Sequence, residues 1–95
     1  MKYRTTRQAD EDIINIYVHG ATAYGVGQAE AYLGELTASI SLLADNPYLA
    51  RERPEFDPPV RIHPHEPHLI VYRIFEGVVL IVRVLHGRQD WESIL

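Results

Sequence analysis

Two β-branched runs separated by a two-residue turn constrain the fold of this chain more than any other feature. Residues 68–75 read HLIVYRIF, residues 78–86 read VVLIVRVLH, and Glu76-Gly77 lies between them. Runs of this length that are rich in Val and Ile form strands. A two-residue linker that contains glycine forms a tight hairpin turn. The sequence therefore predicts an antiparallel β-hairpin in the last third of the chain.

The first half of the chain has helical periodicity instead. Thr6 is a suitable N-cap for a helix that we expect to end near Gly20. A second helical segment follows Gly25 and Gly27 and ends at the Asp-Asn-Pro sequence of residues 45–47, a strong terminator. The apolar positions are Ala9, Ile13, Ile16 and Tyr17 in the first segment, and Ala29, Tyr32 or Leu33, Leu36, Ile40 and Leu43 in the second.

Shorter segments complete the pattern. Lys2–Thr5 is predicted as a strand, and Val60–His63, bounded by prolines, as an edge strand. We expect Tyr48–Pro59 to be irregular and Trp91–Leu95 to form a short terminal turn. The order is β-α-α-β-β-β, which predicts an α+β fold with a helical hairpin on one face of a mostly antiparallel sheet. The length predicts a single domain over residues 1–95.

Composition narrows the classes of function. The chain has no cysteine, so disulfides, Cys-zinc sites and thiol nucleophiles are excluded. Its net charge of −4 without a basic tract disfavours general nucleic-acid binding, because phosphate neutralisation supplies most of that affinity. The N-terminal residues lack the apolar region of a signal peptide, and the longest apolar run, Val78–Val82, is too short to span a bilayer. We therefore expect a cytoplasmic protein without a membrane partner.

An ordered set of residues spread along nearly the whole chain carries a family resemblance. It comprises Ala9, Asp12, Ile13 and Ile16, then Gly27, Ala29, Tyr32 and Leu36, then Leu43, Pro47, Arg51, Arg53, Val60, Arg61, His68, Ile70, Tyr72 and Arg73, and finally residues 81–90, IVRVLHGRQD. In residue type and order this set resembles the ParE branch of the RelE/ParE toxin superfamily.

The resemblance implies a β-α-α-β-β-β fold and a bacterial toxin encoded beside a small antitoxin. In this family the antitoxin combines a ribbon-helix-helix DNA-binding half with a tail that wraps the toxin, so a ParD-like partner and a hetero-oligomer are implied. The usual target is DNA gyrase. Contact of the toxin with DNA is then only indirect, through the antitoxin, and no cofactor is implied.

The end of the last strand carries the candidate contact residues. Arg and Trp are the residue types that dominate protein interfaces. Asp90 has an alternative role, an ion pair with Arg88, Arg83 or Arg61 that fixes the chain end. Trp91 either packs under the terminal turn or anchors an interface. The partner-binding candidates are Arg61, Arg83, His86, Arg88, Asp90 and Trp91.

An enzymatic alternative is a RelE-type, ribosome-dependent mRNA endonuclease built on Arg83, His86 and Arg88. Histidine moves protons near neutral pH, and arginine stabilises a phosphorane-like transition state. In a regular strand, however, Arg83 and His86 lie on opposite faces, which disfavours a concerted site. We therefore predict no catalytic residues, an Arg83 paired with a carboxylate and a His86 that caps the strand end.

The same alternation predicts how the last strand packs. Val79, Ile81 and Leu85 are expected on one face, and the intervening valines and Leu80 on the other. Only one face of the sheet packs on the helical hairpin, so we expect an apolar strip on the free toxin that the antitoxin tail covers.

A histidine-rich segment offers one metal-site alternative. His63, His65, Glu66 and His68 have side chains that suit zinc. Pro64 and Pro67 make the segment a stiff loop, and no further zinc motif supports the site. We expect exposed loop histidines and no metal.

Overall fold

The computed structural model describes residues 1–95 as a mixed sheet with a helical hairpin on one side. The sheet order is β1-β5-β4-β3-β2. β1 runs parallel to β5, and every other neighbouring pair is antiparallel, which confirms the predicted α+β class and mostly antiparallel sheet. The elements are β1 (Lys2–Thr5), α1 (Arg7–Tyr24), α2 (Val26–Asp45), β2 (Glu52–Arg53), β3 (Val60–His65), β4 (His68–Phe75), β5 (Val78–His86) and α3 (Trp91–Ile94).

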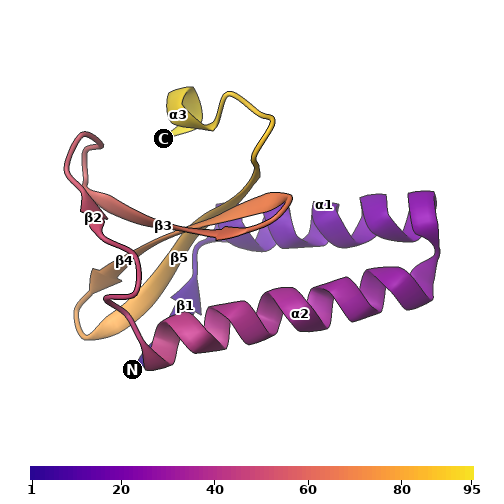
Figure 1. Ribbon diagram of the computed structural model, residues 1–95, viewed down its shortest axis with the longest axis horizontal. Coiled ribbons are helices and arrows are strands. Elements are labelled where there is room, and N and C mark those ends of the chain that lie inside the picture. The colour runs from indigo at the N-terminus through magenta and orange to yellow at the C-terminus, as the bar shows by residue number, and fades with distance from the viewer.

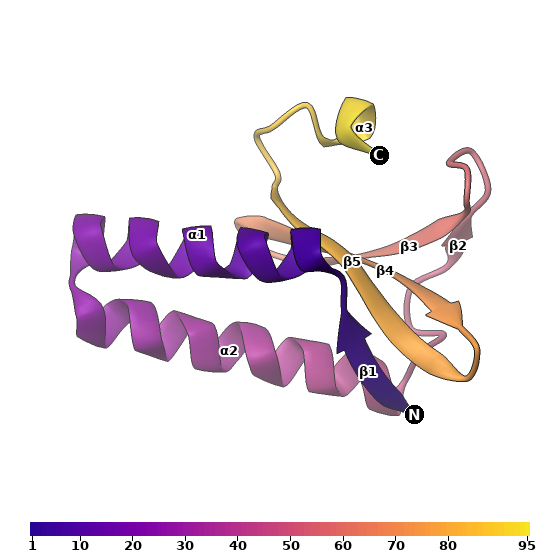
Figure 2. The ribbon, with the colours of Figure 1, turned by 180° about the vertical axis from the view of Figure 1, so that it is seen from behind.

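The sheet has two unlike sides. Figure 1 and Figure 2 show α2 on one side and the short α3, with the C-terminus, on the other. They also show α1 and α2 extending beyond the edge of the sheet, so that the tip of the helical hairpin projects from the body. We refer below to the helix-covered face, which α1 and α2 overlie, and the open face, on which α3 lies.

The helical hairpin turns at one residue. Thr6 caps α1 as predicted, since its Oγ1 accepts a backbone amide proton at 3.0 Å. The expected stop at Gly20 is wrong: α1 continues for another turn because Gly20 packs against Ala29 of α2, where an added Cβ would lie 3.5 Å from the Ala29 Cβ. The break falls at Gly25, whose φ of 95° favours glycine.

The main core lies between the helical hairpin and the sheet. Its deepest polar group is the hydroxyl of Tyr72, which donates to the carbonyl of Pro47 at 2.9 Å and accepts from the amide of Ala50 at 3.3 Å. These bonds fasten the loop after α2. The nine buried residues of this core include three of the predicted α2 stripe and are Ala9, Leu36, Ile40, Leu43, Ile70, Tyr72, Val79, Ile81 and Val84.

The open face has a much smaller core. Three buried residues, Val60, Val71 and Leu85, form it. The side chains that cover them come from the β2–β3 loop, the strands and the C-terminal segment, and all remain partly exposed. These covering residues are Phe56, Ile62, Val82, Trp91 and Leu95.

A β-bulge in β5 makes the two faces differ from the sequence prediction. Tyr72 of β4 pairs with Ile81, whereas the preceding Val71 pairs with Arg83, so Val82 is an extra residue in β5. An extra residue shifts every later side chain to the other face.

The shift changes which β5 residues pack together. Val84 joins Val79 and Ile81 in the main core, and Leu85 lies in the smaller core on the open face. The expectation that Leu85 shares a face with Val79 and Ile81 is therefore wrong. Alternation alone did not reveal the bulge because β5 is apolar at nearly every position.

The edges of the sheet follow the prediction with two differences. Tyr48–Pro59, expected to be irregular, contains the two-residue β2, and β3 continues past His63 to His65. β2 pairs only with Val60 and Arg61, so the rest of β3 lies at the sheet edge as predicted.

The β4–β5 hairpin is confirmed. Its turn residues, Glu76 and Gly77, have φ values of 49° and 78°, the positive values that a type I′ turn requires.

Candidate contact surfaces

Arg83 is held in a structural ion pair at the bulge. The carboxylate of Asp12 accepts from its Nε at 2.8 Å and its Nη2 at 3.0 Å, and also from the amide of Val84 at 3.0 Å. Hydrogen bonding with Asp12 holds the pKa of the Arg83 guanidinium above its usual value. Thr6 Oγ1 donates to the carbonyl of Val82 at 2.7 Å. The start of α1 thus satisfies the backbone groups that the bulge frees.

His86 lies in a cluster of rings on the helix-covered side of the sheet. Its ring centroid is 5.3 Å from that of His68, its partner in β4. His68 Nδ1 lies 2.6 Å from the hydroxyl of Tyr32 on α2. Burial, and then the carboxylate of Glu35, raise the pKa of Tyr32 to about 12, so the phenol stays neutral. Burial, and then the imidazoles of His86 and His65, lower the pKa of His68.

Hydrogen bonds fix the tautomer of one of these rings. The amide of Arg88 donates to His86 Nδ1 at 3.0 Å, so the neutral His86 ring carries its proton on Nε2. The backbone amide of His86 also donates to the side-chain carbonyl of Gln89 at 2.7 Å. His86 therefore organises the end of β5, as the strand-end prediction required.

The histidine-rich segment is not an exposed loop, and that expectation is wrong. His65 is the last residue of β3 and His68 the first of β4, and the two are paired across the strands. His65 Nδ1 lies 2.7 Å from the hydroxyl of Ser39 on α2, so both histidines face the helical hairpin. Nowhere do three His, Cys, Asp or Glu side chains come together in a way that would hold a metal ion.

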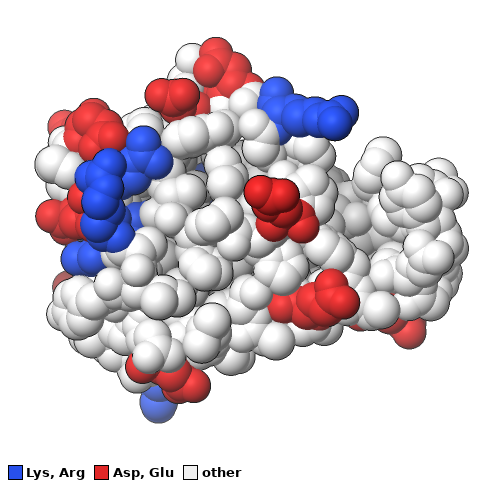
Figure 3. All heavy atoms as spheres, in the orientation of Figure 1, with Lys and Arg blue, Asp and Glu red and all other residues white.

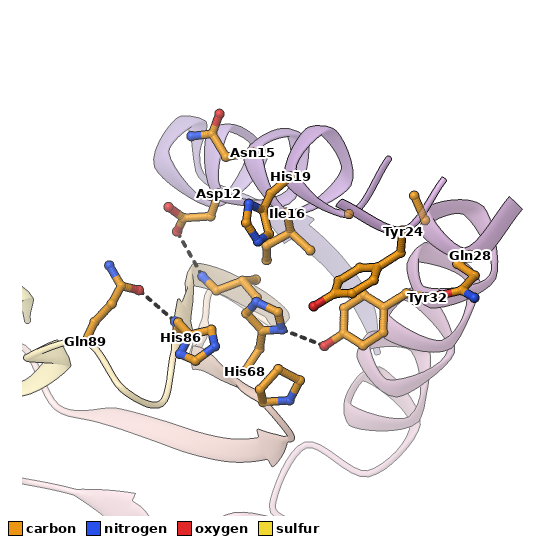
Figure 4. A pocket seen from close by; sticks show the side chains of 14 residues that line it. Asp12, Asn15, Ile16, His19, Tyr24, Gln28, Tyr32, His68, His86 and Gln89 are labelled. Carbon is orange, nitrogen blue, oxygen red and sulfur yellow. Dashed lines mark hydrogen bonds between the residues drawn. The ribbon is translucent and has the colours of Figure 1, made fainter. Parts of the chain in front are cut away.

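A pocket, which we call the helix-side hollow, lies beside these rings. The helix-side hollow has a volume of about 510 Å³ and lies between the two helices and the ends of β4 and β5. Figure 4 shows Asn15 and His19 of α1, Gln28 and Tyr32 of α2, and the side-by-side imidazoles around it. Aromatic and amide side chains dominate its lining.

A second surface lies on the open face around Trp91. The indole is partly buried, and its centroid lies 6.2 Å from the ring of Phe56. The guanidinium of Arg53 lies 5.5 Å from the indole centroid and 5.6 Å from that of Phe56. We call Arg53, Phe56 and Trp91 the open-face cluster. Both roles considered for Trp91 are compatible with this position, because the ring covers the smaller core and keeps an exposed edge.

The other predicted contact residues are dispersed. Arg61 donates to the carbonyl of Ala50 at 2.6 Å and lies over the ring of Tyr48. Arg88 is exposed, and its side chain makes no hydrogen bond or ion pair. The suggested ion pair of Asp90 is wrong: its carboxylate accepts from the hydroxyl of Ser93 at 2.7 Å, one turn into α3.

Comparison with known proteins decides the family. The sequence profile described as "ParE toxin of type II toxin-antitoxin system, parDE" matches residues 3–91. The chain belongs to the ParE toxin family. "Toxin ParE1" of Mycobacterium tuberculosis is 43% identical over 68 residues, which cover 70% of this chain and 69% of that protein. "Toxin ParE1" of Caulobacter vibrioides is 34% identical over 89 residues, which cover 93% and 91%.

A solved structure has the same fold as this ParE chain. The structure is described as "Chromosomal ParDE TA system from P. aeruginosa" and superposes with a TM-score of 0.79 at 24% identity, covering 90% of this chain and 95% of the other. The resemblance inferred from the sequence is thereby confirmed for family and fold.

Sequence reasoning missed several residues that this ParE chain brings to the two surfaces. Phe56 and Arg53 lie in the segment expected to be irregular, far from Trp91 in the sequence. Tyr32 was taken for a core or rim residue, although it binds His68 across 36 positions. No local periodicity reports such pairs, because the bonds depend on how the helical hairpin docks on the sheet.

Proposed function

We propose that this ParE-type toxin arrests growth by binding DNA gyrase in the cytoplasm and that it acts without catalysis. The observation that supports binding over catalysis is the separation of the three candidate catalytic residues. Arg83 forms an ion pair with Asp12, and His86 lies against the ring of His68. Arg88 is exposed in the turn that follows β5. A phosphate clamp and a proton-transfer group are most effective when they converge on one reacting atom.

The open face supplies the proposed contact with gyrase. Its aromatic and arginine side chains are of the types enriched in interface centres. The open-face cluster is only partly buried. Arg88, three residues before Trp91 in the chain, is exposed and makes no side-chain hydrogen bond or ion pair. Of the residues proposed for partner binding, Trp91 and Arg88 are assigned to this contact. Arg61, Arg83, His86 and Asp90 are proposed to hold the segment in place.

We further propose that a ParD-like antitoxin with a ribbon-helix-helix half covers the tip of the helical hairpin, and that contact with DNA occurs only through that antitoxin. From Ile13 to Gly34 the only charged residue is Glu30. Figure 3 shows the projecting end of the molecule as an almost uncharged surface. Ile14, Val18, Tyr24 and Val26 are all more than half exposed there. An apolar surface of this kind favours a partner. None of the three helices is long and apolar enough to cross a membrane.

Two activity assays on the purified chain test the proposal. We expect inhibition of gyrase-catalysed supercoiling and no cleavage of message on translating ribosomes. His86→Ala should leave gyrase inhibition within a few-fold of wild type, whereas loss of a general acid typically costs about a hundredfold or more. Ribosome-dependent cleavage that His86→Ala abolishes in a folded chain would instead establish the RelE-type endonuclease alternative.

A further inference from the structure

We propose that the helix-side hollow binds the purine base of a nucleoside or of single-stranded RNA. This inference does not depend on gyrase as the target, since the hollow lies on the helix-covered side of the sheet and the proposed gyrase contact on the open face.

The size of the hollow suits a ring system with a sugar. Its volume of about 510 Å³ lies within the range of roughly 300–1,000 Å³ of small-molecule sites. Gly20 and Ala29 form part of its wall, at the point where the two helices pack closely. Val84 and Ile16 add an apolar surface against which a flat ring can pack.

The sheet end of the hollow presents hydrogen-bond donors. His86 carries its free proton on Nε2, because Nδ1 accepts from the Arg88 amide. The Tyr32 hydroxyl lies 2.6 Å from His68 Nδ1 and 3.4 Å from the carbonyl of His65. In the tautomer in which the phenol donates to Nδ1, the shorter contact, His68 carries its proton on Nε2. The side-chain carbonyl of Gln89 accepts from the His86 backbone amide, so the NH₂ group of Gln89 remains to donate to a ligand. These groups suit the ring-nitrogen and carbonyl acceptors of a purine.

The helical side of the hollow presents amides and rings. Asn15 and Gln28 make no hydrogen bond within the protein, and each has the paired donor and acceptor that matches the edge of an adenine. Tyr24, Tyr32 and His19 offer flat surfaces on which bases stack. Figure 4 shows His19, Tyr24 and Tyr32 on the side of the imidazoles, with Asn15 further out on α1.

The charges around the hollow favour the base over the phosphate. No lysine or arginine lines it, and its one carboxylate, that of Asp12, is committed to Arg83. Burial and neighbouring imidazoles lower the pKa of His68, which disfavours a positive charge on that ring. Phosphate groups are bound by fixed positive charge. A bound nucleotide would therefore leave its phosphates outside.

Titration of the full-length chain with adenosine and guanosine, followed by NMR and calorimetry, tests the proposal. We expect a Kd of about 0.1 mM for a purine nucleoside, typical of a ligand of this size, with shifts at the His68 and His86 Nε2 protons and weaker binding of cytidine. If single-stranded oligoadenylate binds more tightly than adenosine, the bound base belongs to RNA. If the two bind with equal affinity, the ligand is a free nucleoside.

A matched pair of variants locates the site. Gln28→Leu should weaken adenosine binding about tenfold, the value of one lost hydrogen bond. Gln8→Leu changes the same side chain at an exposed position of α1 away from the hollow and should change nothing. Asn15→Leu repeats the first test at another exposed position. Absence of binding at the solubility limit of adenosine would overturn the proposal. So would tighter binding of N-acetyltryptophanamide, which indicates a site for a partner's side chain.

Discussion

The two faces of the sheet differ in how completely they are closed. The helix-covered face packs nine buried residues against α1 and α2. The open face buries three residues under a loop, a four-residue helix and two partly buried rings. Buried apolar area is the main source of stability. The difference therefore indicates that one face holds the fold together, while the other retains aromatic and arginine side chains for contacts.

Core truncation should separate the two faces most strongly. Leu36→Ala removes a fully buried side chain from the helix-covered core and should lower the free energy of unfolding by about 3 kcal/mol. Phe56→Ala removes a partly buried ring from the open face and should cost about 1 kcal/mol, since the ring covers a core of only three buried residues. Urea unfolding measures both. Equal losses would contradict the division of the faces.

The ion pair that joins α1 to the bulge should have the next largest effect. Asp12→Ala leaves Arg83 and the amide of Val84 without their acceptor, and we expect a loss of about 2 kcal/mol. The matched control is Glu11→Ala, which removes an exposed pair with Arg7 and should cost about 0.5 kcal/mol or less. Urea unfolding of the two variants gives the comparison. A Glu11 effect as large as that of Asp12 would exclude a special role for the bulge.

Local patterns were sufficient for the elements of this fold. The Thr6 cap, the α2 stripe and the Glu76-Gly77 turn each depend on neighbours in the sequence, and the structure confirms all three. The same patterns gave the order of the elements, and the family resemblance then supplied the toxin class.

Those local patterns could not predict which residues pair over long distances in the sequence. The bulge at Val82 lies in an unbroken apolar run, so alternation gave the wrong faces for Leu85. Gly20 was read as a helix stop because sequence alone does not reveal the close approach of Ala29. The partner of Arg83 was predicted only as a carboxylate, and Asp12 lies 71 positions away.

The pH dependence of stability should come mainly from the helix-covered side. Burial lowers the pKa of both His68 and His63 in the folded chain, so the unfolded chain binds protons more readily. Their contribution is complete above the unfolded value of about 6.5. It is lost progressively as the pH falls through that value towards the folded pKa. Urea unfolding at a series of pH values between neutral and mildly acid measures this loss.

Two variants assign that loss. His68→Phe should reduce the slope of stability against pH in this range, because it removes the half-buried titrating ring. His19→Gln, at an exposed position, should leave the slope unchanged. A slope that stays the same in His68→Phe would place the pH dependence elsewhere.

Binding of purified gyrase to an immobilised chain tests most directly whether the open face is the contact surface. Arg88→Glu reverses a charge that makes no contact within the protein, so the fold should be kept. We expect gyrase affinity to fall about tenfold, with antitoxin binding unchanged. Arg7→Glu makes the same charge change at the exposed start of α1, outside the open-face cluster, and should leave gyrase affinity near wild type. Equal gyrase affinity in wild type and Arg88→Glu, or an equal loss in both variants, would contradict the account.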